Sequence, residues 1–150
     1  MSLVVYNSSA ATVLPTVGPD PSGLQTKSLN GQLEVFSRLK GHSEGNNPPW
    51  YQHADYSIYD PQGNELQHVD NTVGYYATAP RVITLPAGKY LIKAPAKGVF
   101  PLEVPVMIES GRLTSVHLDG AWKLPANTPG TQYVNSPSGY PVGWRLNGTQ

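Results

Sequence analysis

The feature that most constrains this chain is a strict two-residue alternation in the run from Leu102 to Ile108. Side chains of a β-strand point to opposite faces in turn, so a period of two places one set of residues on a single face. Pro105 lies inside the run and predicts an edge strand or a bulge, because proline has no N–H for the ladder. Helical periodicity is essentially absent along the chain, so we predict an all-β fold. The alternating apolar residues are Leu102, Val104, Val106 and Ile108.

The alternation belongs to a longer regular stretch, Arg81 to Gly120. Val82–Leu85 is predicted to be a strand, and Leu85–Tyr90 (LPAGKY) a tight turn in which Gly88 supplies the left-handed residue of a hairpin. A second turn is expected at Ser110–Gly111. The stretch therefore predicts a meander of four strands joined by short turns. Further core-facing residues expected in it are Tyr90, Ile92, Ala94, Thr114, Val116 and Leu118.

Three more strands are predicted before this stretch, at Gly31–Leu39, Ala54–Tyr59 and Glu65–Val69. Asp60–Asn64 is a turn signal in which the Asp60 carboxylate caps its own turn and Gly63 takes a positive φ. Two segments are expected to be irregular. Lys40–Trp50 is rich in Gly, Asn and Pro, which disfavour regular pairing, and Asp70–Pro80 contains two adjacent tyrosines.

The chain of 150 residues is long enough for one domain with extended ends. Its 15 glycines and 15 prolines suit many short strands with frequent turns. We expect residues 1–30 to form an extended arm or linker, residues 31–120 a single antiparallel β-sandwich, and residues 121–150 a tail. The arm either is a flexible linker or packs along an edge of the sandwich and shields it. Residues 132–134 and 142–146 of the tail either form a small hairpin packed on the sandwich or lack regular structure.

Charge and composition exclude several classes of protein. Ten basic and ten acidic residues cancel, so no basic field is present to recruit nucleic acid or anionic lipid. No apolar run is long enough to predict a transmembrane segment. The chain has no cysteine, which excludes disulfides and thiolate metal sites. The start of the sequence, Met1–Tyr6, is too short and uncharged for a signal peptide, and we expect Met1–Leu3 to be a leader on a mature chain whose export signal was removed.

No catalytic, metal or cofactor motif emerges from the residues. The four histidines, His42, His53, His68 and His117, lack the spacing of a zinc site, and His117 is expected to be an ordinary surface residue. The carboxylates are scattered over turns and outer faces, and no nucleophile-elbow motif occurs. The sequence predicts no enzyme, no metal and no cofactor. The alternative, a small hydrolase, would require His53, His68 and Asp55 to converge.

Aromatic residues in the two irregular segments are the candidate binding residues. They are Trp50, Tyr51, Tyr75 and Tyr76. Such side chains either stack on sugar rings or grip a peptide, or they fold down and close the core beneath the loops. The same two interpretations apply to Trp122 and Trp144 in the tail, where the second would anchor the tail to the sandwich.

Several of these segments together resemble carboxypeptidase regulatory-like domains, which are transthyretin-like, or prealbumin-like, Ig-like β-sandwiches of secreted bacterial proteins. The similar residues are Tyr56–Asp60 with Gly63, Leu85–Tyr90, Val104–Val106 and Gly111–Val116, within a span from about Gly31 to Gly120. The chain departs from the family pattern in the Lys40–His53 insertion and at both ends.

The resemblance implies a secreted, periplasmic or cell-surface module without catalysis, which acts as an accessory, structural or protein-interaction domain. The alternative is a carbohydrate-binding module that uses the loop aromatics. The partner is therefore an unknown protein or glycan.

Overall fold

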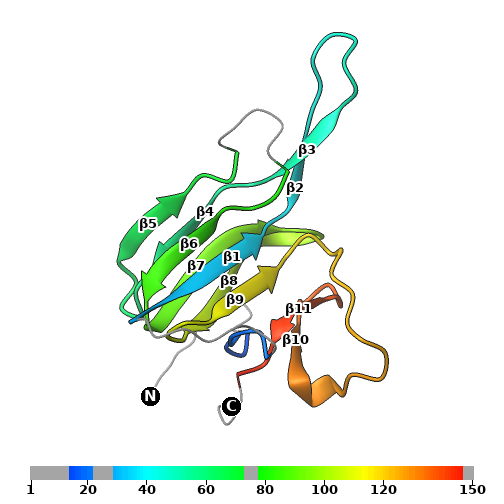
Figure 1. Ribbon diagram of the computed structural model, residues 1–150. Coiled ribbons are helices and arrows are strands. Elements are labelled where there is room, and N and C mark those ends of the chain that lie inside the picture. The colour runs from blue at the N-terminus through cyan, green and yellow to red at the C-terminus, as the bar shows by residue number, and fades with distance from the viewer. Residues whose placement is uncertain (1–13, 22–28, 73–77, 147–150) are drawn as a thin grey trace, which may run out of the picture.

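Two β-sheets packed face to face form the body of the fold, and two hairpins are attached to it (Figure 1). The computed structural model describes residues 14–21, 29–72 and 78–146. The first sheet has the strand order β6-β1-β9, with β1 Asn30–Phe36, β6 Val82–Pro86 and β9 Leu113–His117. The second has the order β5-β4-β7-β8, with β4 Tyr56–Tyr59, β5 Glu65–Val69, β7 Gly88–Ala96 and β8 Val99–Ile108. The all-β prediction is confirmed. Pairing is antiparallel except between β1 and β9, which run parallel.

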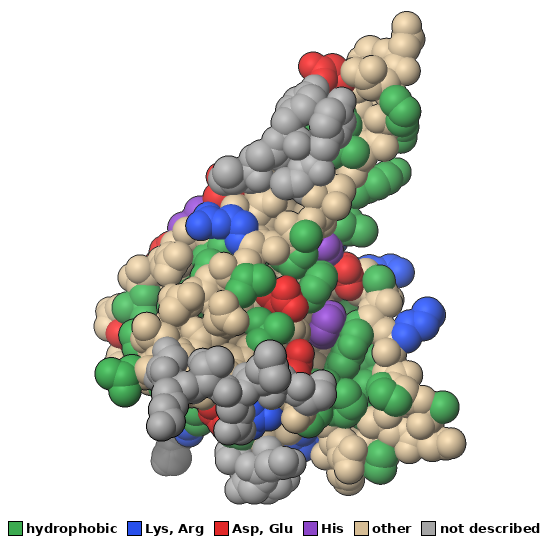
Figure 2. Space-filling view, in the orientation of Figure 1, with side chains coloured by type: hydrophobic (Ala, Val, Ile, Leu, Met, Phe, Trp, Pro, Cys, Tyr) green, Lys and Arg blue, Asp and Glu red, His purple; other side chains and the backbone are tan. Residues whose placement is uncertain are grey.

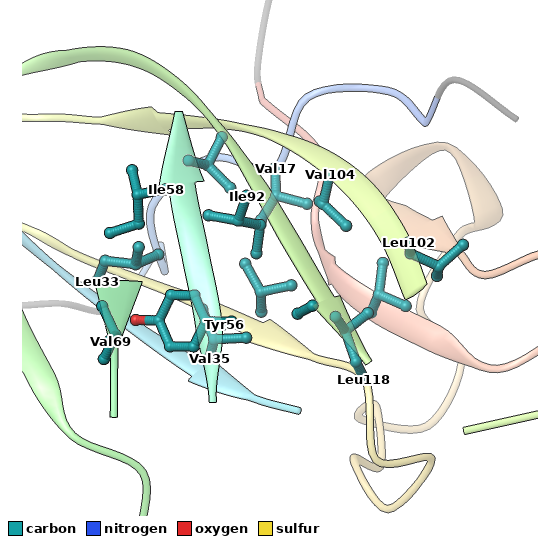
Figure 3. Close-up of a cluster of buried hydrophobic side chains, with 14 of the residues drawn as sticks. Val17, Leu33, Val35, Tyr56, Ile58, Val69, Ile92, Leu102, Val104 and Leu118 are labelled. Carbon is teal, nitrogen blue, oxygen red and sulfur yellow. The ribbon is translucent and has the colours of Figure 1, made fainter. Parts of the chain in front are cut away.

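The core lies between the two sheets and follows the alternation seen in the sequence. In β1 the buried Leu33 and Val35 alternate with more exposed neighbours, and β4 contributes Tyr56 and Ile58 in the same way. Figure 3 shows the Tyr56 ring beside Val35 and Val69. All four alternating residues of β8 are buried, as predicted: Leu102, Val104, Val106 and Ile108.

The predicted four-strand meander is wrong. Only β7 and β8 of its four strands pair with each other, whereas β6 and β9 lie on either side of β1 in the opposite sheet. The LPAGKY segment is therefore a crossing between sheets rather than a hairpin. Gly88, with a φ of 151°, lies at this crossing. Alternation reports which face of a strand is buried, but it carries no information about which strand lies alongside.

The open edge of β8 is covered by the N-terminal arm. The Val17 N–H donates to the Pro105 carbonyl at 2.9 Å, and the Met107 N–H donates to the Val17 carbonyl at 2.9 Å. Pro105 thus lies on the edge strand of the four-stranded sheet, as expected. The pairing with Val17 uses only the Pro105 carbonyl, so the missing N–H costs no hydrogen bond there. This part of the arm packs on the sandwich and shields a strand edge from other chains.

The tail pairs with the other side of the arm, so that the arm lies between β8 and the tail. Strands β10 (Tyr133–Asn135) and β11 (Pro141–Trp144) form an antiparallel hairpin. The Gly18 N–H donates to the Trp144 carbonyl at 3.0 Å, and the Leu146 N–H donates to the Thr16 carbonyl at 3.2 Å. A Cβ on Gly143 would lie 2.7 Å from a Val17 methyl group, so this glycine allows the close approach of arm and hairpin. A short 3-10 turn, η2 (Gly130–Gln132), precedes β10.

The prediction that Lys40–Trp50 is an irregular loop is also wrong in part. Strands β2 (Leu39–His42) and β3 (Trp50–His53) pair as an antiparallel hairpin that projects from the sandwich (Figure 1). Glycine and proline break the ladder only at the tip, between these two strands. The turn at Asp60 forms as predicted: its carboxylate accepts the N–H groups of Gln62 and Asn64, each at 2.9 Å, and Gly63 has a φ of 92°.

Within the described ranges, no helix has the length and apolar character needed to cross a bilayer.

Candidate functional site

The base of the β2–β3 hairpin is fixed to the sandwich by buried polar groups. His53 Nδ1 donates to the Ser37 carbonyl at 2.6 Å, and the Ser37 hydroxyl donates to the Ala54 carbonyl. The buried Asn71 side chain donates to the carbonyls of Val35 and Ala54, at 3.3 and 3.1 Å. The Arg38 N–H donates to the Pro95 carbonyl of β7 at 2.9 Å. Buried and satisfied hydrogen bonds make the local structure rigid. The base of the hairpin is therefore held in a fixed position relative to the sandwich.

One face of the hairpin presents apolar groups to solvent. Gly41 lies opposite Tyr51 in the register, and Leu39 lies two residues before Gly41 on the same face. A Cβ on Gly41 would be 3.1 Å from the Tyr51 ring, so the ring lies close over the glycine backbone. Tyr51 is 53% exposed and Leu39 is 44% exposed. We call Leu39, Gly41 and Tyr51 the hairpin face; Figure 2 shows hydrophobic groups along this projection.

Trp50 points to the opposite side of the hairpin from Tyr51, because neighbouring residues of a strand alternate. Its ring stacks on His42, with centroids 5.2 Å apart and planes at 18°. Tyr75 and Tyr76, the other two predicted binding residues, lie outside the described residues. Trp50 and Tyr51 therefore do not share one aromatic platform.

His117 is not an ordinary surface residue, contrary to the sequence prediction. Its ring lies between Phe36 and Trp122, with centroid distances of 4.7 and 4.4 Å and nearly parallel planes. Trp122 in turn meets Trp144 edge to face at 5.5 Å. Burial lowers the pKa of His117 to about 4, although Asp119 acts in the opposite direction. This stack anchors the tail on the outer face of the three-stranded sheet.

Of the three residues that a hydrolase would need to bring together, His68 and Asp55 lie close to each other and His53 does not join them. Ser57 and His68 face each other on β4 and β5, with 3.1 Å between Ser57 Oγ and His68 Nδ1. His68 Nε2 lies 3.7 Å from Asp55 Oδ2. His53 instead donates to Ser37 at the hairpin base. The His68 side chain is 58% exposed, so water has free access to a group that a hydrolytic site would place in a cleft.

Two carboxylates meet on the outer face of the three-stranded sheet. The Ser115 hydroxyl donates to Glu34 at 2.9 Å and lies 3.4 Å from Asp20 Oδ2. Burial raises the pKa of Asp20, and Glu34 adds to the effect, while the hydrogen bond from Ser115 opposes it. No group of three or more His, Asp or Glu side chains suited to a metal ion occurs among the residues that the structure describes.

A cavity of about 510 Å³ lies where the arm, the β8–β9 turn and the tail meet. None of its lining residues was singled out in the sequence as a binding residue except Trp144. They come from four separate segments, so spacing in the sequence carried no signal of their proximity. The lining residues are Pro19, Pro21, Glu109, Arg112, Gln132, Trp144, Arg145 and Leu146.

Comparisons of the chain with protein-family models, with curated proteins and with solved structures found no match.

Proposed function

We propose that this protein is a non-catalytic β-sandwich module, secreted or attached to the cell envelope, that binds a protein partner through the hairpin face. The observation that carries the proposal is the projecting β2–β3 hairpin with Tyr51 and Leu39 exposed on one side. The extracellular placement and the relationship to carboxypeptidase regulatory-like domains rest on the resemblance of the sequence.

Two properties of the β2–β3 hairpin support this proposal: apolar side chains are exposed on one face, and hydrogen bonds hold its base in place. Apolar side chains that are exposed together favour contact with a second surface, since association removes them from water. Tyrosine is enriched at interfaces because its ring buries a large area at small conformational cost. A hairpin whose base is held by Ser37, His53 and Asn71 loses little further freedom on binding.

The test is affinity capture from the envelope fraction of the source cells with matched variants. Tyr51→Ser removes the exposed ring, and Leu66→Ser removes an equally exposed apolar side chain, 52% accessible, from β5. We expect a specific partner to be retained by the wild type and by Leu66→Ser, and to be lost with Tyr51→Ser. Equal retention by both variants would contradict the proposal.

The alternative function is carbohydrate binding at the same face. It is favoured by the Tyr51 ring, which lies over Gly41 and leaves about half of its surface open to a sugar ring. A glycan array separates the two functions: a signal that disappears with Tyr51→Ser supports the carbohydrate function, and silence over neutral and charged glycans removes it for this face.

A further inference from the structure

The cavity between the arm, the β8–β9 turn and the tail offers a second binding site, at the end of the sandwich opposite the hairpin. Gly88 and Ile108 pair at the cavity end of the β7–β8 ladder, while the hairpin base is tied to Pro95 at the other end. The cavity volume of about 510 Å³ lies within the usual range of ligand sites, about 300–1,000 Å³.

The charge of this cavity is dominated by one arginine. Arg112 is neutralised by Glu109, with 3.2 Å between Nη1 and Oε1, and its Nη2 donates to the Asp20 carbonyl at 2.8 Å. Arg145 has no carboxylate partner within the described part of the chain. Its Nη2 donates to the Tyr133 carbonyl at 3.2 Å, which orients the guanidinium group. A planar guanidinium with free donors is suited to a carboxylate.

The other walls combine flat apolar groups with hydrogen-bonding groups. Pro19, Pro21 and Leu146 supply apolar surface, and Gln132 and Glu109 supply donors and acceptors. The Arg145 N–H donates to the Gln132 carbonyl at 2.9 Å, so the two residues stay side by side. A sugar ring matches such a lining, because it has apolar faces and a rim of hydroxyl groups.

From these observations we propose that the cavity binds a carboxylated sugar, that is, a uronate unit of an acidic polysaccharide. Arg145 holds the carboxylate, Pro19 and Pro21 contact the sugar ring, and Gln132 hydrogen-bonds to hydroxyl groups. This site is independent of the hairpin face.

The experiment is isothermal titration of the full chain with trigalacturonate and with other short uronate oligomers. Neutral trisaccharides and the methyl ester of trigalacturonate serve as ligand controls. We expect binding of at least one uronate oligomer, with the matching ester or neutral sugar at least tenfold weaker. Arg145→Gln is expected to weaken uronate binding at least tenfold and Gln132→Ala several-fold.

Arg38→Gln is the matched charge control, because Arg38 is exposed near the hairpin base at the other end of the sandwich. This variant and Tyr51→Ser should bind uronate as the wild type does. The proposal is overturned if no uronate oligomer binds, if esters bind as well as acids, or if Arg145→Gln and Arg38→Gln have equal effects. Failure here leaves the hairpin result unaffected, since Tyr51→Ser is scored in a separate assay.

Discussion

Replacing Tyr56 with phenylalanine should make the protein more stable. Tyr56 is only 2% exposed, and its buried hydroxyl group has no hydrogen-bond partner among the residues that the structure describes. A buried, unsatisfied polar group costs about 1–3 kcal/mol of folding free energy. Phenylalanine keeps the ring that fills the core between the sheets and removes this cost. We therefore expect Tyr56→Phe to raise the free energy of unfolding by about 1 kcal/mol at pH 7.

The gain should increase at alkaline pH. Burial raises the pKa of Tyr56, so the folded state holds its proton while an unfolded tyrosine loses it above a pH of about 10. Stability from this group is complete below that pH and declines above it. At pH 11, ionisation of this residue stabilises the unfolded wild type by about 1.4 kcal/mol. The phenylalanine variant has no group to ionise here, so its unfolded state is not stabilised in this way. The difference between the two proteins should therefore rise to about 2.4 kcal/mol.

Urea denaturation at pH 7 and pH 11 measures both quantities, with equal m-values as the condition for comparison. Tyr90→Phe is the control: the Tyr90 hydroxyl donates to the Pro86 carbonyl at 2.6 Å, so its removal should cost about 0.5–1 kcal/mol. If Tyr56→Phe destabilises the protein at pH 7, or if its advantage does not grow at pH 11, the reasoning about an unsatisfied hydroxyl is incorrect.

Three further predictions concern other buried or half-buried positions. His117→Phe should keep both ring contacts and flatten the stability profile between pH 6.5 and 4. Over this range the unfolded wild type binds a proton that the folded wild type does not, which lowers its free energy of unfolding by about 3 kcal/mol at pH 4. An unchanged acid limb in chemical denaturation would contradict this. Asp20→Asn should stabilise the fold more at pH 7 than at pH 3, because a raised carboxyl pKa disfavours the ionised form; equal effects at both pH values would show that burial of the charge is unimportant. Gly31→Ala should cost about 3 kcal/mol because its Cβ would lie 2.2 Å from the Glu109 carbonyl oxygen. Gly130→Ala should change the melting temperature little, because no atom of the described residues lies within 4 Å of the added Cβ. A melting temperature for Gly31→Ala equal to that of Gly130→Ala would refute the packing argument.

The buried faces of the strands were predictable from the sequence, but their neighbours were not. The two-residue period identified the core side of β8 correctly, from Leu102 to Ile108. It could not show that β6 and β9 flank β1, because strands of both sheets carry the same period. The β2–β3 hairpin is hidden in the sequence because the Gly and Pro residues of its seven-residue tip make the whole Lys40–Trp50 segment resemble a loop.

The candidate sites were less predictable than the fold, because they depend on residues far apart in the chain. Tyr51 was selected for its residue type and position, and the structure exposes it. The local sequence predicts His117 at the surface, since nothing near it indicates that Trp122 from the tail covers its ring. Arg145 has no motif around it, and only the packing of the tail on the arm brings it to Arg112. Long-range contacts of this kind leave no short-range pattern.

The most direct measurement is site-specific photocrosslinking in the source cells. A photoreactive phenylalanine derivative at position 51 reports on the hairpin face, and the same group at position 66 reports on an equally exposed part of the other sheet. We expect one discrete protein adduct from position 51 that is absent from position 66 and that is suppressed when Leu39→Ser is added. Adducts of equal pattern and yield from both positions, or none from position 51, would contradict the claim that the hairpin face binds a protein partner.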